Sequence, residues 1–187
     1  MAAHLLVLPT TAYLIERAVV ADVDAIHGVR ESLAEQLASA LEARFAAVFE
    51  ANKEEAGTAF SANAEAMARR AIANLSLSYL VRTGKQSWLD ACAAQFENAT
   101  NMTDQAAALR NLVNSPAELA VGLRAAALES FHAQWQHEAL VVDQWFAVQA
   151  TNTLPGALSR VEALMQHADF DIKNPNKVRS LIGAFCG

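Results

Sequence analysis

Residues 115–135, SPAELAVGLRAAALESFHAQW, contain the clearest local structural pattern in the chain. Ser115, Pro116 and Glu118 match a helix start, with serine at the N-cap, proline in the first helical position and glutamate reaching back to the cap. Apolar residues then recur at four-residue steps, at Leu119, Leu123, Ala127, Phe131 and Trp135. This spacing places them on one face of a helix. The segment therefore predicts an amphipathic helix that begins at Ser115.

The same spacing recurs on both sides of this segment. Further helices are expected after Pro9, over 22–52, 61–82, 87–97, 103–113, 140–150 and 158–164, and after Asn174. The run 22–52 is either one bent helix or two that break near Leu37. Its expected inner face is Ile26, Val29, Leu33, Leu37, Leu41, Phe45 and Val48. The helix over 61–82 is expected to bury Ala68, Ile72, Leu75 and Tyr79 and to end at Gly84, which can adopt a left-handed cap.

Composition agrees with a helical chain. Of 187 residues, 53% are hydrophobic and only 18% are charged, which excludes disorder. β-Branched residues are scattered, and no segment has a convincing strand pattern. The short breaks between helices favour antiparallel neighbours. We expect an all-α fold, a single domain over 1–187 built as an irregular superhelix of antiparallel helix pairs (HEAT/ARM-like), with a closed bundle as the second choice.

The C-terminal segment suggests that the superhelix is truncated. The chain stops at Gly187, directly after an apolar helix face, whereas a solenoid normally ends in a capping helix with a polar outer side. Leu181, Ile182 and Phe185 are therefore expected to pack on helices that this chain lacks. Left uncovered, these side chains predict self-association of the chain through this end.

Charge, hydropathy and cysteine content exclude several classes of protein. The net charge is −6 and no basic patch stands out, so nucleic acid is not an expected partner. The longest apolar runs fall short of the ~18 residues that a membrane span needs, so no membrane association is expected. Cys92 and Cys186 are too few for a disulfide scaffold, and both are expected to be packed thiols. These features predict a cytoplasmic chain.

No autonomous active site is apparent in the chain. His132 and His137 are five residues apart, whereas a zinc helix of the H-E-x-x-H type needs four. Glu129 and His132 form a single E-x-x-H pair, and di-iron bundles need two, so a surface glutamate and a partly buried histidine are expected. Asp143 is expected on a solvated face rather than as a buried, satisfied carboxylate. We therefore predict no catalytic residues and no metal ligands here.

Three later blocks resemble one known domain. They are NMTDQAAAL at 101–109, LVVDQWFAVQA at 140–150 after Trp135, and NPNKVRSLIGAF at 174–185. In order and spacing they are similar to the C-terminal helical domain of bacterial aminopeptidase N, in the M1 family of zinc aminopeptidases. The first half of the chain fits more loosely, through Leu8-Pro9, 24–33 and the helix over 69–80. The likeness spans nearly the whole chain.

The resemblance implies that this chain is one non-catalytic part of a larger peptidase. In that family the zinc ligands and the substrate-binding G-A-M-E-N block lie in a preceding catalytic domain, and neither motif occurs here. The C-terminal domain closes over the catalytic cleft and lines the substrate cavity. The implied partners are therefore the catalytic domain of the same parent chain and a peptide substrate. The block at 174–185 faces the cavity, so Arg179, Asn176 and Lys177 are its candidate residues, although arginine is common at position 177.

Two other functions compete with this hypothesis. A stand-alone helical-repeat module would bind a protein partner, and an open reading frame without an upstream H-E-x-x-H motif would favour it. A metal-carboxylate bundle enzyme lacks the necessary ligands. The cap-domain hypothesis makes the parent a zinc metallo-aminopeptidase and this chain inactive alone.

Overall fold

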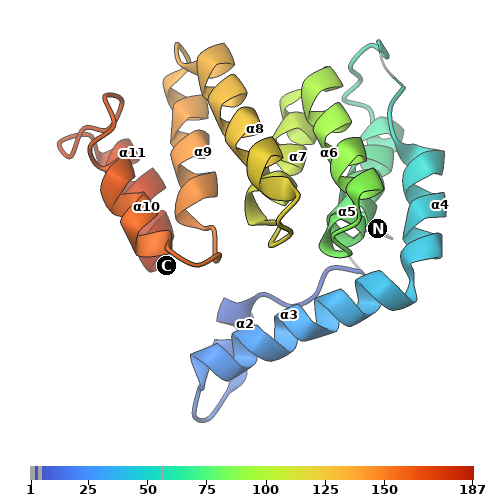
Figure 1. The fold of residues 1–187 in the computed structure, drawn as a ribbon, viewed down its shortest axis with the longest axis horizontal. Helices are drawn as coiled ribbons and strands as arrows, with labels where there is room; N and C mark the ends of the chain where they lie inside the picture. Colours follow the sequence, from blue (N-terminus) through green and yellow to red (C-terminus); the bar gives the residue numbers. More distant parts are fainter. Residues whose placement is uncertain (1–2, 4–5, 56) are drawn as a thin grey trace. The chain divides into compact units, whose positions relative to one another are not determined.

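The computed structural model describes residues 3, 6–55 and 57–187, and every regular element within them is helical (Figure 1). The predicted all-α class is confirmed. The chain divides into two compact units, Met1–Gln105 and Ala106–Gly187. Each unit is described separately below, and the single domain over 1–187 stays a prediction. In the described residues, no helix combines the length and apolar character needed to span a bilayer.

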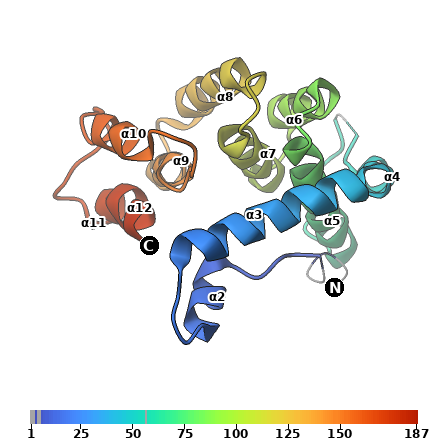
Figure 2. The same cartoon turned by 60° about the horizontal axis from the view of Figure 1, so that its bottom comes forward.

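Among its described residues, the first unit contains five complete helices and the first turn of a sixth. The helices are α2 (Thr11–Arg17), α3 (Val23–Ala40), α4 (Glu42–Asn52), α5 (Ala64–Arg82), α6 (Gln86–Asn98) and the start of α7 (Met102–Asn114). Helix α2 folds back along α3, and α4 lies beside α5 (Figure 2). The Phe45 ring stacks on Tyr79 with centroids 4.5 Å apart, and Leu77, Leu80 and Leu89 are fully buried.

The run 22–52 forms two helices, one of the two arrangements expected, but they separate at Leu41 instead of Leu37. The Asp22 side chain caps α3 by accepting a hydrogen bond from the Ala25 N–H at 3.0 Å. The expected inner face is wrong for α3, which buries only Ala34 and Ala38. A continuous stripe requires a continuous helix, and the break at Leu41 changes the face that each half presents. Val29 and Leu33 precede this break and are 69% and 45% exposed, because the covered side of α3 follows Ala34 and Ala38.

Helix α5 buries a broader surface than the expected stripe. Ala68 is exposed, and Ile72 and Leu75 are only half-buried, although Tyr79 is buried as expected. Helices α3, α4 and α6 all pack against α5, so it has neighbours on several sides. The side chains that it buries are therefore Arg70, Ala73, Ser76, Leu77, Tyr79, Leu80 and Val81. Gly84 follows with a φ of 69°, the left-handed conformation that was expected.

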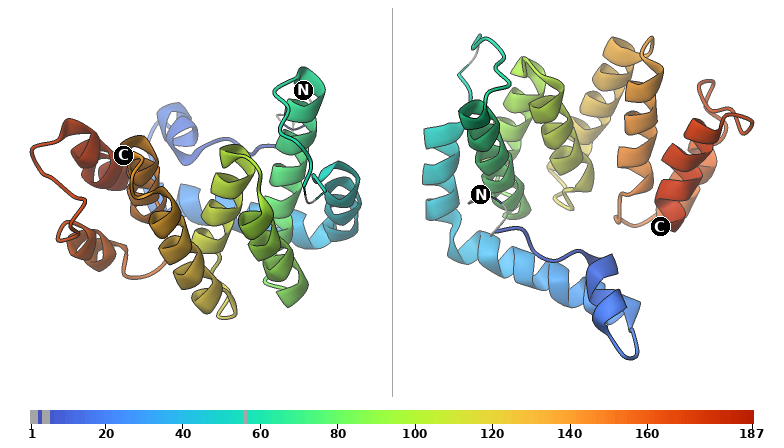
Figure 3. Two further views of the ribbon diagram at one scale, coloured as in Figure 1. Left: turned by 90° about the horizontal axis from the view of Figure 1, so that it is seen from above. Right: turned by 180° about the vertical axis from the view of Figure 1, so that it is seen from behind.

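The second unit contains the rest of α7 and the helices that follow it. These are α8 (Ala120–Trp135), α9 (Ala139–Ala150), α10 (Ala157–Leu164), α11 (Pro175–Val178), the π-helical turn η1 (Arg179–Gly183) and α12 (Ala184–Cys186). Helices α8 and α9 form an antiparallel pair, drawn in yellow and orange in Figure 3. Phe131, Phe146, Leu109, Leu112 and Leu181 are almost fully buried in this unit.

The start of α8 differs from the expected capping box. The Ser115 hydroxyl accepts from the Ala117 N–H at 3.4 Å, and the helix begins only at Ala120. The Ser115 carbonyl accepts a hydrogen bond from the Arg124 guanidinium at 2.7 Å. The Ala120 N–H donates to the Ala117 carbonyl at 3.0 Å. The segment 115–119 therefore forms a turn ahead of the helix.

The C-terminal apolar face is largely covered within the chain. Leu181 is fully buried and packs in η1 against α9, and Ile182 and Phe185 are half-buried. The expectation that Leu181 needs helices absent from this chain is therefore wrong. Self-association through this end stays a prediction. Cys92 is buried as expected, whereas Cys186 is exposed and is not a packed thiol.

Candidate functional site

The segment 174–186 is one helical run interrupted by a π-helical turn. The Asn174 side chain accepts from the Asn176 N–H at 3.0 Å, and Pro175 occupies the first helical position, as predicted. The Ala184 N–H then bonds to the Arg179 carbonyl, five residues earlier. Single π-helical turns inside α-helices are rare and occur frequently at functional sites. The turn begins at Arg179, one of the three candidate cavity residues.

Lys177 points into the second unit. Its side chain is buried, and its Nζ lies 2.8 Å from Asp143 Oδ1. The ammonium also donates to the Ala139 carbonyl at 3.3 Å and lies 5.5 Å from the centroid of the Phe146 ring. All three partners belong to α9, so Lys177 fastens the C-terminal helix to α9. This arrangement favours a structural role for Lys177.

Asp143 forms the other half of this pair. Its side chain is only 15% exposed and is held by Lys177. The expectation of a solvated Asp143 is therefore wrong, and the alternative of a largely buried carboxylate is closer, although Oδ1 is held by the Lys177 ion pair and by no hydrogen bond from a residue that the structure describes. A local sequence pattern does not reveal such a pair, because its two halves lie on different helices.

Arg179 and Asn176 differ from Lys177 in both exposure and partners. Both residues are exposed, and neither side chain makes a hydrogen bond or ion pair with a residue that the structure describes. The two are three residues apart, which places them on neighbouring positions of one helix face. The candidates therefore separate into one internal lysine and two side chains that remain available to a ligand.

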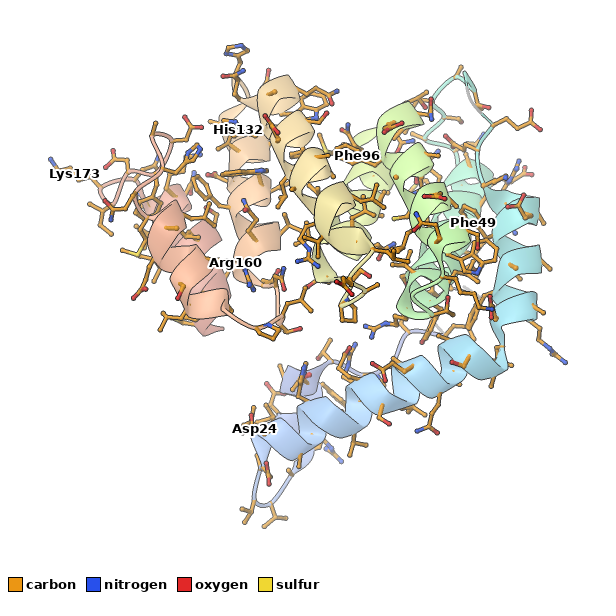
Figure 4. The ribbon with its side chains drawn as sticks, in the orientation of Figure 1. Asp24, Phe49, Phe96, His132, Arg160 and Lys173 are labelled. Carbon is orange, nitrogen blue, oxygen red and sulfur yellow. The ribbon has the colours of Figure 1, made fainter. Side chains whose placement is uncertain are left out.

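His132 lies on α8, facing the loop between α10 and α11 (Figure 4). It is 23% exposed, as expected for a partly buried histidine, and its Nε2 lies 2.6 Å from Asp169 Oδ2. His167 and Trp145 flank its ring, at centroid distances of 5.1 and 4.8 Å. His167 and Asp169 were not among the residues expected from the sequence, where their only signal is a histidine two residues before an aspartate in a loop.

A polar pocket of about 340 Å³ lies in the first unit. The buried Asp104 carboxylate is part of its lining and accepts hydrogen bonds from the Asn74 amide at 2.7 Å and the Asn101 amide at 2.9 Å. The Gln95 amide donates to Asn74 Oδ1 at 2.7 Å and completes the network. The network therefore includes two residues of the block 101–109 on which the family resemblance depends. These amide contacts satisfy Asp104, so the pocket has a structural explanation.

An apolar groove of about 550 Å³ runs between α2 and α3. Leu8, Pro9, Leu14, Ile26 and Leu33 line it, with Arg17 and Arg30 among its few polar residues. Exposed apolar surface of this kind is characteristic of protein contacts.

Comparisons with known proteins agree with this architecture. The profile of a family described as "Domain of unknown function (DUF3458_C) ARM repeats" matches residues 1–187. Its ARM-repeat description confirms the predicted superhelix of helix pairs as the fold class. Aminopeptidase N of Escherichia coli K12 is 36% identical over 188 residues, covering 100% of this chain and 21% of the relative. Aminopeptidase N of Caulobacter vibrioides is 38% identical over 188 residues, covering 98% and 20%.

A solved structure gives the same result. Legionella pneumophila aminopeptidase A, crystallised with aspartic acid, superposes with a TM-score of 0.83 at 30% identity and covers 98% of this chain and 22% of its own. The chain thus spans about a fifth of the length of these relatives. The predicted resemblance to the C-terminal helical domain of aminopeptidase N is confirmed.

Proposed function

Because the chain belongs to this ARM-repeat family, we propose that it is the non-catalytic C-terminal cap domain of an M1 zinc aminopeptidase. The parent enzyme releases N-terminal amino acids from peptides in the cytoplasm, and this domain closes the active-site cleft and lines the substrate cavity. Relatives named aminopeptidase N match the chain from end to end, although it spans only a fifth of their length. That observation is the main support for the proposal.

The zinc of the parent enzyme belongs to its catalytic domain in this proposal. The chain contains no H-E-x-x-H motif, so its residues do not match the ligand set of a zinc aminopeptidase. Zinc supplies an activated water and polarises a carbonyl when it is bound there. The contribution of this chain is to bind and enclose the peptide.

Arg179 is the residue that contacts the peptide in this proposal. Its exposed guanidinium offers five N–H donors in a fixed fork, which matches a carboxylate or successive backbone carbonyls. The Lys177–Asp143 ion pair anchors the turn immediately before it, so the backbone of Arg179 is held in place. Asn176, on the same helix face, adds an amide donor and acceptor.

The groove between α2 and α3 is the surface that contacts the catalytic domain in this proposal. Its apolar lining contains Val29 and Leu33, which are 69% and 45% exposed. Burying an apolar side chain of this size contributes roughly 1.5–3 kcal/mol. A contact with another part of the same parent chain would cover this surface.

The experiment uses the complete parent enzyme and compares Arg179→Ala with Lys173→Ala, a loss of an exposed cation in the nearby loop. Losing a hydrogen bond to a charged group costs about 1.5–3 kcal/mol, so kcat/KM for tripeptides and longer peptides should fall roughly tenfold or more in Arg179→Ala. Turnover of a single-residue aminoacyl arylamide should change little. Equal effects on both substrates, or none on either, would make Arg179 a surface residue without this role.

A further inference from the structure

Three potential metal ligands converge beside α8 in the second unit. They are His132, His167 and Asp169, and their ligand atoms all lie within 4.8 Å of one another. Asp169 Oδ2 stands between the two rings, 2.6 Å from His132 Nε2 and 3.7 Å from His167 Nδ1. All three side chains are half-buried, so they remain accessible to a small ion.

The three residues already contact one another through hydrogen bonds that a metal ion would replace. The backbone N–H of Asp169 donates to His167 Nδ1 at 3.2 Å, so this nitrogen carries a lone pair, and a metal ion would replace the N–H as its partner. The Asp169 carboxylate makes no ion pair with lysine or arginine in the described part of the chain. Its partners are the imidazole of His132 at 2.6 Å and, more distantly, that of His167 at 3.7 Å, and a metal ion would lie between the carboxylate and both rings.

The ligand atoms, which lie within 4.8 Å of one another, must rearrange by up to about an ångström or slightly more to accept a metal ion. Tetrahedral Zn²⁺ with nitrogen and oxygen ligands at about 2.0–2.2 Å separates neighbouring ligand atoms by about 3.3–3.5 Å. The His132–Asp169 contact must therefore open from 2.6 Å and the His167–Asp169 contact must close from 3.7 Å. The two imidazole nitrogens, which lie within 4.8 Å of each other, must also approach. His167 and Asp169 lie between α10 and α11, outside regular helix, so these adjustments do not require a helix to move.

Aromatic rings enclose one side of the cluster. Trp145 lies 4.8 Å from the His132 ring and 5.1 Å from His167, and Phe146 lies 5.9 Å from His167. An apolar surround limits access of water and strengthens the attraction between a cation and its ligands. A simple hydrogen bond from His132 to Asp169 would already tie the loop to α8. That contact does not require a second histidine, whose Nδ1 lies 3.7 Å from the same oxygen.

We propose that His132, His167 and Asp169 bind one Zn²⁺ ion, which fixes the α10–α11 loop to α8. Two imidazoles and one carboxylate suit zinc and leave its fourth position for water. No metal ligand was expected from the sequence, because His132 and His137 are five residues apart and only one E-x-x-H pair occurs. The three residues proposed here are brought together only by the fold. The site is structural, and it holds the loop that leads into the helix of Arg179.

The test titrates the metal-stripped 187-residue chain with ZnCl₂ by isothermal calorimetry, in a Cys186→Ser background that removes the exposed thiol. The variants His167→Ala and Asp169→Asn are compared with His137→Ala, which removes an exposed histidine just beyond α8. We expect one Zn²⁺ per chain, weakened at least about tenfold by either site variant and unchanged by the control. Mg²⁺ should not bind, because it prefers oxygen ligands.

Thermal melting provides a second readout that keeps the test decisive if one variant folds poorly. Zn²⁺ should raise the Tm of the 187-residue Cys186→Ser chain and of its His137→Ala variant, but not that of its Asp169→Asn variant. The proposal is overturned if the chain binds Zn²⁺ no tighter than about 100 µM. It is also overturned if His137→Ala loses as much affinity as His167→Ala.

Discussion

Replacing Lys177 by methionine tests how the C-terminal helix is held to α9. Methionine preserves the apolar stem of the side chain but removes the ammonium that lies 2.8 Å from Asp143 Oδ1. The carboxylate then stays in a site where it is only 15% exposed, without its cation. Breaking a buried ion pair from one side costs about 3–5 kcal/mol. Because both side chains keep some exposure to solvent, we expect Lys177→Met to lose about 2–3 kcal/mol of unfolding free energy, less than for a fully buried pair.

The reverse variant, Asp143→Asn, should lose less unfolding free energy than Lys177→Met. In Asp143→Asn the Lys177 ammonium still donates to the Ala139 carbonyl and still lies over the Phe146 ring. These remaining contacts limit the expected loss to about 1–2 kcal/mol. The double variant removes both charges and should lose about 2 kcal/mol, less than the two single losses combined.

The assay is urea unfolding of the unmodified chain, the two single variants and the double variant. Circular dichroism and tryptophan fluorescence monitor the unfolding. Lys173→Met is the matched control, because Lys173 is exposed and points away from the helices (Figure 4), and it should change stability by less than about 0.5 kcal/mol. A Lys177→Met loss no greater than that of the control would refute the reasoning. Additive effects of the two single variants would refute it as well.

Two further changes test other contacts. Burial alone would raise the pKa of Glu31, but the hydrogen bond from Arg82 and the charges around it lower that pKa below its ordinary value of 4.5. The ionised form is therefore favoured in the folded state, and its contribution to stability is present above pH 4.5 and lost as the pH falls through the lowered pKa. The free energy of unfolding, measured from pH 7 downward, should decrease less steeply with falling pH in Glu31→Gln than in the unmodified chain. An unchanged slope would contradict this prediction. Asn152→Ala removes a buried amide that donates to the Val113 carbonyl at 2.9 Å and should cost about 2–3 kcal/mol in urea unfolding. Asn98→Ala, at an exposed amide, should cost under about 0.5 kcal/mol, and equal losses would contradict the prediction.

Local sequence patterns predicted most helices, because periodicity and capping depend on neighbouring residues. Asp22 and Asn174 cap their helices as expected, and Gly84 has the left-handed conformation. The buried faces were harder to predict, because they depend on which helices pack together. Val29 and Leu33 belong to an apolar stripe in the sequence, yet the fold leaves them exposed.

The candidate site shows the same division. Arg179 and Asn176 were found through a block of consecutive residues, and the structure leaves both side chains exposed. The partners of His132 were not found, because Asp169 lies 37 residues away and only the loop after α10 brings it close. The π-helical turn at Arg179 was not predicted either, since a single extra residue in one turn barely changes the apolar spacing.

The most direct test of the proposed role compares this chain with its complete parent enzyme. Each purified protein is mixed with an aminoacyl arylamide and Zn²⁺, with and without a chelator. The account predicts chelator-sensitive hydrolysis by the parent and none by residues 1–187, which contain no H-E-x-x-H motif. Chelator-sensitive hydrolysis by the 187-residue chain alone, or a parent protein with no aminopeptidase activity, would contradict it.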